Sequence, residues 1–198
     1  MRTLLFTLLL VVCLSRTYPM YKQCDSRWGS HQLGTSSNTI CKAGCLMSSA
    51  AMALAGTGHS YNPDTLNNWL KANGGYVSGD LFVWTAIGKL GLNYHGKIAN
   101  SEIKAHLDKG YVVICNVHNG GHWVLAHGYS GDNILVNDPG FDTSSYSLSG
   151  IVNGNTAIYS GNGIPTIINN LKIEAEERID EFFGNQKFVA VQEKPALL

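Results

Sequence analysis

An uninterrupted run of small and apolar residues, Cys45 to Ala55, constrains the fold of this chain more than any other stretch. The run contains no proline or glycine, and Met47, Ala51 and Leu54 recur at the spacing of one helix face. We therefore predict a buried helix that begins at Cys45. Unpaired backbone N–H groups and the helix dipole favour the nucleophilic thiolate there. The alternative is a small buried cysteine that only begins a core helix.

The later segments predict further helices and then a sheet. Capping and breaking residues indicate helices at about residues 61–73 and 100–110. A third helix is expected at 80–90, where apolar residues recur on one helix face: Leu81, Trp84, Ile87 and Leu90. Alternating and β-branched residues separated by turn residues indicate strands. The expected strands are residues 92–95, 111–117, 122–129 and 133–137, with weaker signals at 145–148 and 157–159. Helices first and an antiparallel sheet second imply an α+β layer fold.

The two ends of the chain differ from the middle. Residues 1–17 combine a charged start, an apolar run and small residues, which is typical of a secretory signal peptide. A membrane anchor is the alternative, but the apolar run is short for a span. We expect a secreted or lumenal protein without a membrane anchor after cleavage. Its expected parts are a domain at 18–160, a linker at 161–166, an amphipathic helix at 167–184 and a tail at 185–198. The apolar stripe of that helix would pack on the domain or bind a separate partner.

Composition excludes several classes of function. Lys and Arg together number 14, as do Asp and Glu, so no basic surplus exists for nucleic acid. The chain has no GxxxxGK[ST] motif for phosphate, and no HExxH or CxxC motif for a metal. We therefore expect no metal, no organic cofactor and no nucleic-acid partner.

Four cysteines remain after the expected cleavage, and an oxidising compartment favours pairing. Cys24 and Cys41 both lie in the Gly/Ser-rich segment before the helix, which makes them the easiest pair. Cys115 lies in a β-branched run and reads as a buried strand residue. Cys45 would then stay free, as a nucleophile must, although all three pairings remain formally open.

A thiol nucleophile needs a general base, and two of the seven histidines share one predicted strand. His122 and His127 are five positions apart and point to opposite faces, so only one can face Cys45. His122 is the better candidate because two glycines precede it and leave room for a substrate backbone. Asp138 ends the next strand and could orient the imidazole.

The register of the hairpin decides whether Asp138 and His122 share a face. A two-residue loop, Gly131-Asp132, would place Asp138 opposite Leu125 and away from His122. A three-residue loop or a β-bulge would place it opposite Val124, on the His122 face. If Cys45, His122 and Asp138 act together, the hairpin must therefore contain either a three-residue loop or a β-bulge.

Several blocks of the chain together resemble the papain-like cysteine peptidases of the bacteriocin-leader-processing type. The blocks are Gln23-x-Asp25-x-x-Trp28, Gly44-Cys45, Gly121-His122-Trp123-Val124 and Asn137-Asp138-Pro139, within Tyr21 to Tyr159. The resemblance implies a papain-like fold, with Cys45 as nucleophile, His122 as base, Asp138 as its orienting partner and Gln23 as oxyanion donor. Gln23 lies 22 positions before Cys45, further than in the leader-processing enzymes.

The sequence thus predicts a secreted thiol hydrolase that acts on peptide or related amide bonds in peptides or proteins. The same triad would also serve acyl transfer to an amine. The alternative from another class is a catalytically silent fold that binds peptides or glycans through exposed aromatic residues such as Trp28, Trp84 and Trp123.

Overall fold

The structure is a computed structural model that describes residues 17–161. The predicted signal peptide lies outside these residues, apart from its last position, as do the predicted C-terminal helix and tail. Of the predicted linker only Gly161 is described, and it ends a strand. None of the described helices is long and apolar enough to cross a membrane.

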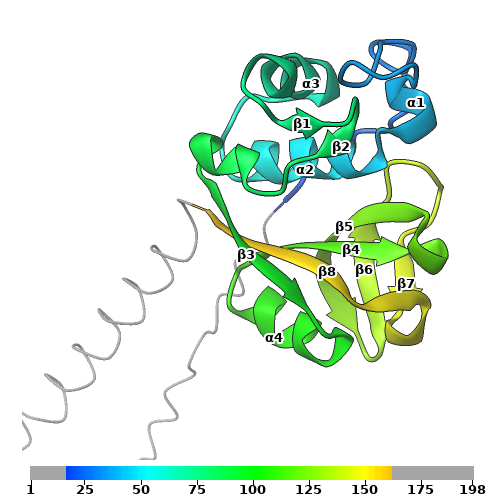
Figure 1. The fold of residues 1–198 in the computed structure, drawn as a ribbon. Coiled ribbons are helices and arrows are strands. Elements are labelled where there is room, and N and C mark those ends of the chain that lie inside the picture. Colours follow the sequence, from blue (N-terminus) through cyan, green and yellow to red (C-terminus); the bar gives the residue numbers. More distant parts are fainter. Residues whose placement is uncertain (1–16, 162–198) are drawn as a thin grey trace, which may run out of the picture. The chain divides into compact units, whose positions relative to one another are not determined.

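A helical layer and a sheet make up the fold (Figure 1). The helical layer comes first in the chain and also carries a small hairpin. Its elements are α1 (Ile40–Ala43), α2 (Cys45–Gly56), α3 (Pro63–Ala72), β1 (Tyr76–Val77), β2 (Leu81–Phe82) and the 3-10 turn η1 (Ala86–Leu90). The order of helices first and antiparallel strands second confirms the α+β prediction.

The sheet has six antiparallel strands in the order β3-β8-β4-β5-β6-β7. The strands are β3 (Leu92–Ile98), β4 (Val112–Val117), β5 (His122–Ser130), β6 (Asn133–Asn137), β7 (Ser145–Ser147) and β8 (Ile151–Gly161). Between them lie α4 (Ile103–Asp108) and the 3-10 turns η2 (Asn100–Glu102), η3 (His118–Gly120) and η4 (Leu148–Gly150). Strands β4, β5 and β6 lie at the predicted positions and form an antiparallel meander that β7 extends. Strand β8 returns to pair between β3 and β4.

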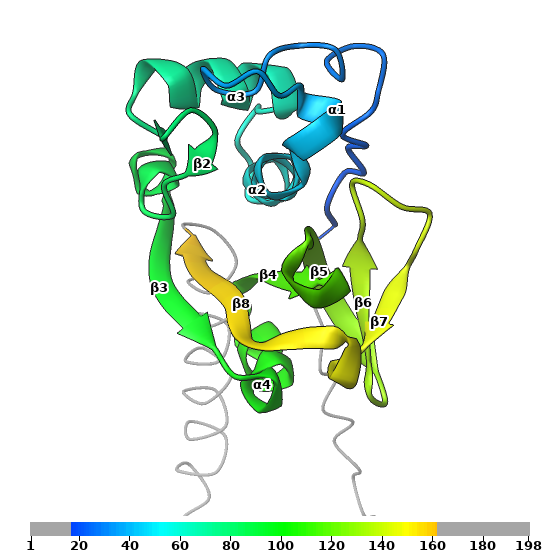
Figure 2. The same ribbon diagram turned by 45° about the vertical axis from the view of Figure 1, so that its right-hand side comes forward.

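Strand β4 lies at the centre of two apolar clusters. All six of its residues are buried, because helices cover both faces of the sheet. Val112 and Ile114 pack in the cluster that includes α2, whereas Val113 and Cys115 pack with Ile103 of α4. Figure 2 shows α2 and α4 on opposite sides of the sheet.

Helix α2 begins at Cys45 because the preceding turn closes tightly. Gly44 is its N-cap, and its amide donates to the carbonyl of Ile40 at 2.8 Å. A Cβ on Gly44 would lie 2.5 Å from that carbonyl oxygen, so only glycine fits. Small side chains such as Ala50 and Ala51 are fully buried and let the helix approach strand β5 closely.

The helix predicted for residues 80–90 is wrong. Ser78 and Gly79 have positive φ values of 48° and 96°, and they turn the chain so that β2 pairs with β1. Trp84 then packs between Tyr94 and Trp123, and only Ala86–Leu90 coils, as a 3-10 turn. The apolar spacing of this segment reflects aromatic packing rather than one helix face.

Candidate active site

The thiol of Cys45 lies at the N-terminus of α2, where the helix meets the start of strand β5. It is free and half-buried. The thiol lies beside the imidazole of His122, the first residue of β5, and helps to raise the pKa of that ring. Two residues that are 77 positions apart in the sequence are thereby brought together.

His122 is fixed from its other side by Asp138. Its Nε2 lies 2.7 Å from Asp138 Oδ1, which leaves Nδ1 for the thiol. His122 is 5% exposed and the carboxylate is fully buried, so water competes little for this contact.

A β-bulge brings the two residues to the same face. Next to the two-residue loop Gly131-Asp132, the pairing is regular: Ser130 pairs with Asn133, and Gly128 pairs with Leu135. The register then shifts at His127, so that Leu125 pairs with Asn137. Asp138 consequently follows opposite Val124, as one of the two predicted irregularities requires.

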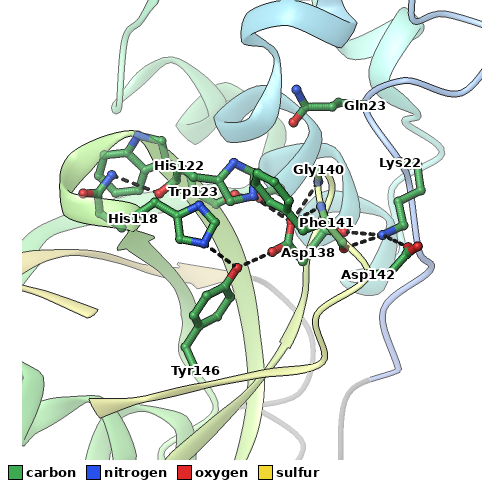
Figure 3. Close-up of polar contacts among 12 residues, drawn as sticks. Lys22, Gln23, His118, His122, Trp123, Asp138, Gly140, Phe141, Asp142 and Tyr146 are labelled. Atoms are coloured by element: carbon green, nitrogen blue, oxygen red, sulfur yellow. Dashed lines mark hydrogen bonds and ion pairs between the residues drawn. The ribbon is translucent and has the colours of Figure 1, made fainter. Parts of the chain in front are cut away.

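The Asp138 carboxylate receives hydrogen bonds from all sides (Figure 3). The amides of Gly140 and Phe141 donate to Oδ1 at 2.8 and 2.9 Å, and the Tyr146 hydroxyl donates to Oδ2 at 2.7 Å. Burial would raise the pKa of Asp138, but these donors and His122 outweigh burial and lower it. The residue is therefore a carboxylate across the physiological range.

The same contacts set the charge of His122. Burial opposes protonation of the imidazole, yet its contacts with the Asp138 carboxylate and with Cys45 raise its pKa to about 9. His122 is therefore an imidazolium at neutral pH, the state that stabilises a neighbouring thiolate and can donate a proton.

The loop after Asp138 is anchored by Lys22, which the sequence did not indicate (Figure 3). Its ammonium donates to the carbonyls of Asp138 and Phe141 at 3.1 and 2.6 Å and pairs with Asp142. Gly140 in this loop passes directly beside the imidazole, since a Cβ there would lie 2.7 Å from His122 Cε1.

His118 is a second site residue that sequence reasoning missed. Its ring stacks on that of His122 with centroids 5.6 Å apart, and its Nε2 lies 3.2 Å from the Tyr146 hydroxyl. The Phe141 ring contacts both imidazoles in T-shaped arrangements. No sequence signal indicates this placement, because it depends on a positive φ of 53° at His118 itself.

Gln23 lies in the same cleft as Cys45 and is 8% exposed. Its Nε2 donates to the Cys41 carbonyl at 2.6 Å, which leaves a second N–H on the same atom. Oε1 is buried without a hydrogen-bond partner among the described residues. The backbone amide of Gln23 donates to Pro139 at 2.8 Å, and the segment is held by the predicted Cys24–Cys41 disulfide, which is present.

Other candidates from the sequence lie outside the site. Cys115 is fully buried, and burial raises the pKa of its thiol to about 12. His127 forms the bulge in β5 rather than contacting the thiol. Trp28, expected to be exposed, is 2% exposed and donates to the Lys22 carbonyl.

Cys45 and His122 open into a cleft of about 650 Å³. One wall comes from the helical layer and its hairpin, the other from the start of β5 and the Asp138 loop. The hairpin wall includes Tyr76, Asp80, Leu81 and Phe82, and the sheet wall includes His118, Trp123, Gly140 and Phe141. The volume and the mixed lining suit a segment of peptide.

Comparisons with known proteins place the fold. A family model described as the Peptidase_C39 like family matches residues 16–153. The structure is similar to a double glycine motif protease from an AMS/PCAT transporter, solved in complex with the leader peptide. That match has 17% identity and a TM-score of 0.51, and it covers 75% of this chain and 94% of that one.

A protein from Bacillus anthracis described as a C39-like peptidase is similar as well. It has 15% identity and a TM-score of 0.50, and the match covers 75% of this chain and 96% of that one. No curated protein matches the chain. At these identities the structures show the fold alone, and they bear out the predicted papain-like α+β architecture.

Proposed function

The chain belongs to the C39-like peptidase family, as the resemblance implied, and from this premise we propose that it is a secreted cysteine peptidase. Cys45 is the nucleophile, His122 the general acid and base, and Asp138 the group that orients His122. The observation that carries the proposal is the continuous contact from the Cys45 thiol through the imidazole to a buried, fully hydrogen-bonded carboxylate. A peptide substrate is in keeping with the leader peptide bound to the similar transporter protease.

In the acylation step, the Cys45 thiolate attacks the carbonyl carbon of the scissile bond. The charge that develops on the oxygen is stabilised by the backbone N–H of Cys45 at the start of α2 and by the second N–H of Gln23 Nε2. The imidazolium of His122 donates its Nδ1 proton to the leaving amine. The C–N bond breaks and a thioester remains on Cys45.

In the deacylation step, neutral His122 accepts a proton from a water molecule that attacks the thioester. The carboxylic acid leaves, and the thiolate–imidazolium pair forms again. Asp138 keeps Nε2–H engaged throughout, so that Nδ1 is the nitrogen that exchanges protons.

Hydrolysis of a peptide library by the purified chain tests this function, with an electrophilic thiol probe as the second readout. The wild type should cleave peptides, and Cys45→Ala should abolish both cleavage and labelling at residue 45. Cleavage that persists in Cys45→Ala would remove the nucleophile from the proposal. Binding of peptides with no cleavage and no rapid labelling would instead indicate the catalytically silent fold.

Addition of amines to the same reaction distinguishes hydrolysis from acyl transfer. A hydrolase releases the acid even when a free amine is abundant, whereas an acyltransferase yields the amide. Mass spectrometry of the products separates the two outcomes.

Secretion is a separate part of the proposal and has its own test. We expect the chain recovered from the medium of expressing cells to begin near residue 18, after a signal peptide at 1–17. N-terminal sequencing that finds an intact Met1 would contradict this.

A further inference from the structure

One charged side chain of the cleft has no role in the proposed chemistry. Asp80 immediately precedes β2 and lines the same cleft as Cys45. Ser36 Oγ and Asn38 Nδ2 both donate to its Oδ2, at 2.9 and 2.7 Å. These two neutral donors lower the pKa of Asp80, so the group carries a full negative charge at neutral pH.

The loops that carry Asp80 and its donors are interlocked. The Gly79 carbonyl accepts from the amide of Thr35 at 2.8 Å. A Cβ on Gly34 would lie 2.1 Å from that carbonyl oxygen, so the two loops can meet only because residue 34 is glycine. The carboxylate is therefore held in a fixed position relative to the cleft rather than moving freely at its rim.

Among residues 17–161, the Asp80 carboxylate has no ion-pair partner, whether Lys, Arg or His. Lys42 also lines the cleft but does not pair with Asp80. Apolar side chains stand next to the carboxylate in the same wall: Tyr76, Leu81 and Phe82. A fixed anion beside an apolar wall suits a side chain with a long aliphatic stem and a cationic end.

We propose that Asp80 is a specificity determinant that selects peptides carrying Lys or Arg close to the scissile bond. The proposal rests on the proposed peptidase function and deepens it. A cavity of this volume is roughly 11 Å across, the length of about three extended residues. The basic residue should therefore lie within about three positions of the bond that Cys45 attacks.

A purely structural role is the competing explanation, because Asp80 also ties two loops together. The substitution Asp80→Asn separates the two roles. Asparagine keeps an acceptor oxygen for Ser36 and Asn38 and removes only the charge. A structural defect would lower the cleavage of all peptides alike, whereas loss of a charge contact changes the ratio between a basic peptide and its neutral isostere.

The experiment measures kcat/KM for peptides that carry lysine or norleucine at each of the three positions on either side of the scissile bond. At one position the wild type should prefer lysine by about two- to fivefold, the range for a solvent-accessible ion pair. The preference should weaken in about 1 M NaCl and fall to near unity in Asp80→Asn. Asp132→Asn, which removes a charge at the far turn of the β5–β6 hairpin, is the matched control and should keep the preference.

The outcomes distinguish this proposal from the function on which it rests. Absence of cleavage of every peptide refutes the peptidase function. Cleavage with equal rates for lysine and norleucine at all positions overturns the role of Asp80 and leaves the peptidase intact. A lysine preference that survives in Asp80→Asn also overturns it, and points to another group in the cleft.

Discussion

Replacing Gly140 by alanine should disable the proposed catalytic pair without removing any chemical group. The new Cβ would lie 2.7 Å from His122 Cε1 and 3.3 Å from Nε2. Favourable carbon–carbon contacts begin near about 3.5 Å, so the imidazole or the loop must move by about 0.8 Å. The backbone itself accepts alanine, since Gly140 is not among the residues with positive φ.

The size of the effect follows from this displacement. A misplacement of about 1 Å in a catalytic group costs about a hundredfold in rate. We therefore expect kcat/KM of Gly140→Ala to fall by about ten- to a hundredfold, or about 1.4 to 2.7 kcal/mol of transition-state stabilisation. The ring is held by Asp138, so the hydrogen bond between them should lengthen as well.

The assay compares peptide cleavage, probe labelling of Cys45 and thermal unfolding for two variants. Gly88→Ala is the matched control, because its Cβ would meet only Asn93 Oδ1 at 3.5 Å and its φ is ordinary. The control should keep wild-type cleavage. Gly140→Ala should remain folded, with a far-UV spectrum like that of the wild type.

Full cleavage by a folded Gly140→Ala would refute the reasoning. It would mean that the imidazole does not need its present position beside the loop, and hence that the close approach at Gly140 is incidental.

Three further results should follow from the site and its surroundings. Cys45 should label rapidly with an electrophile near neutral pH, whereas Cys115 should stay unlabelled because burial raises the pKa of its thiol to about 12. His122→Ala should move the labelling of Cys45 to higher pH. Peptide mapping that found both thiols equally reactive would contradict this. Burial opposes the protonation of His122, but its hydrogen-bonded neighbours raise its pKa to about 9, above the ordinary 6.5. The folded state therefore binds this proton more tightly than the unfolded state, so the resulting stability is fully present below about pH 6.5 and is lost as the pH rises through about 9. Between these two pH values, the Tm of the wild type should fall more steeply than the Tm of His122→Gln. Reduction of the Cys24–Cys41 disulfide, which spans 17 positions, should cost about 3 kcal/mol of unfolding free energy in denaturant titrations, and an unchanged midpoint would contradict the loop-closure argument.

Local patterns were enough to predict the parts of this fold that depend on periodicity. The run after Gly44 is a helix because it holds strong helix formers and no proline, although it is buried all round from Met47 to Leu54 rather than on one face. Of the predicted strands, β6 alternates between buried and more exposed residues, whereas β4 is buried throughout. The helix expected at residues 80–90 failed because Ser78 and Gly79 adopt left-handed conformations, which apolar spacing does not reveal.

The candidate site was also predictable only in part, because local patterns do not reveal how the loops fold. Cys45, His122 and Asp138, which the structure brings together, could be proposed from the sequence because each begins an element or directly follows one, and element ends carry clear residue signals. The contacts of His118 and Lys22 depend on how loops fold back across the sheet, over separations that no local pattern encodes.

Because the site is divided between the helical layer and the sheet, its state reports whether the two layers are packed together. His122 and Asp138 belong to one sheet and stay together as long as β5 and β6 remain paired. Cys45 arrives on α2, so the activation that we propose for it requires that the helical layer be seated on the sheet. During unfolding, a partly opened state with an intact sheet would keep its strand signal yet lose the contact of Cys45 with His122. The labelling rate of one cysteine therefore reports when the two halves of the molecule separate, independently of when each half melts.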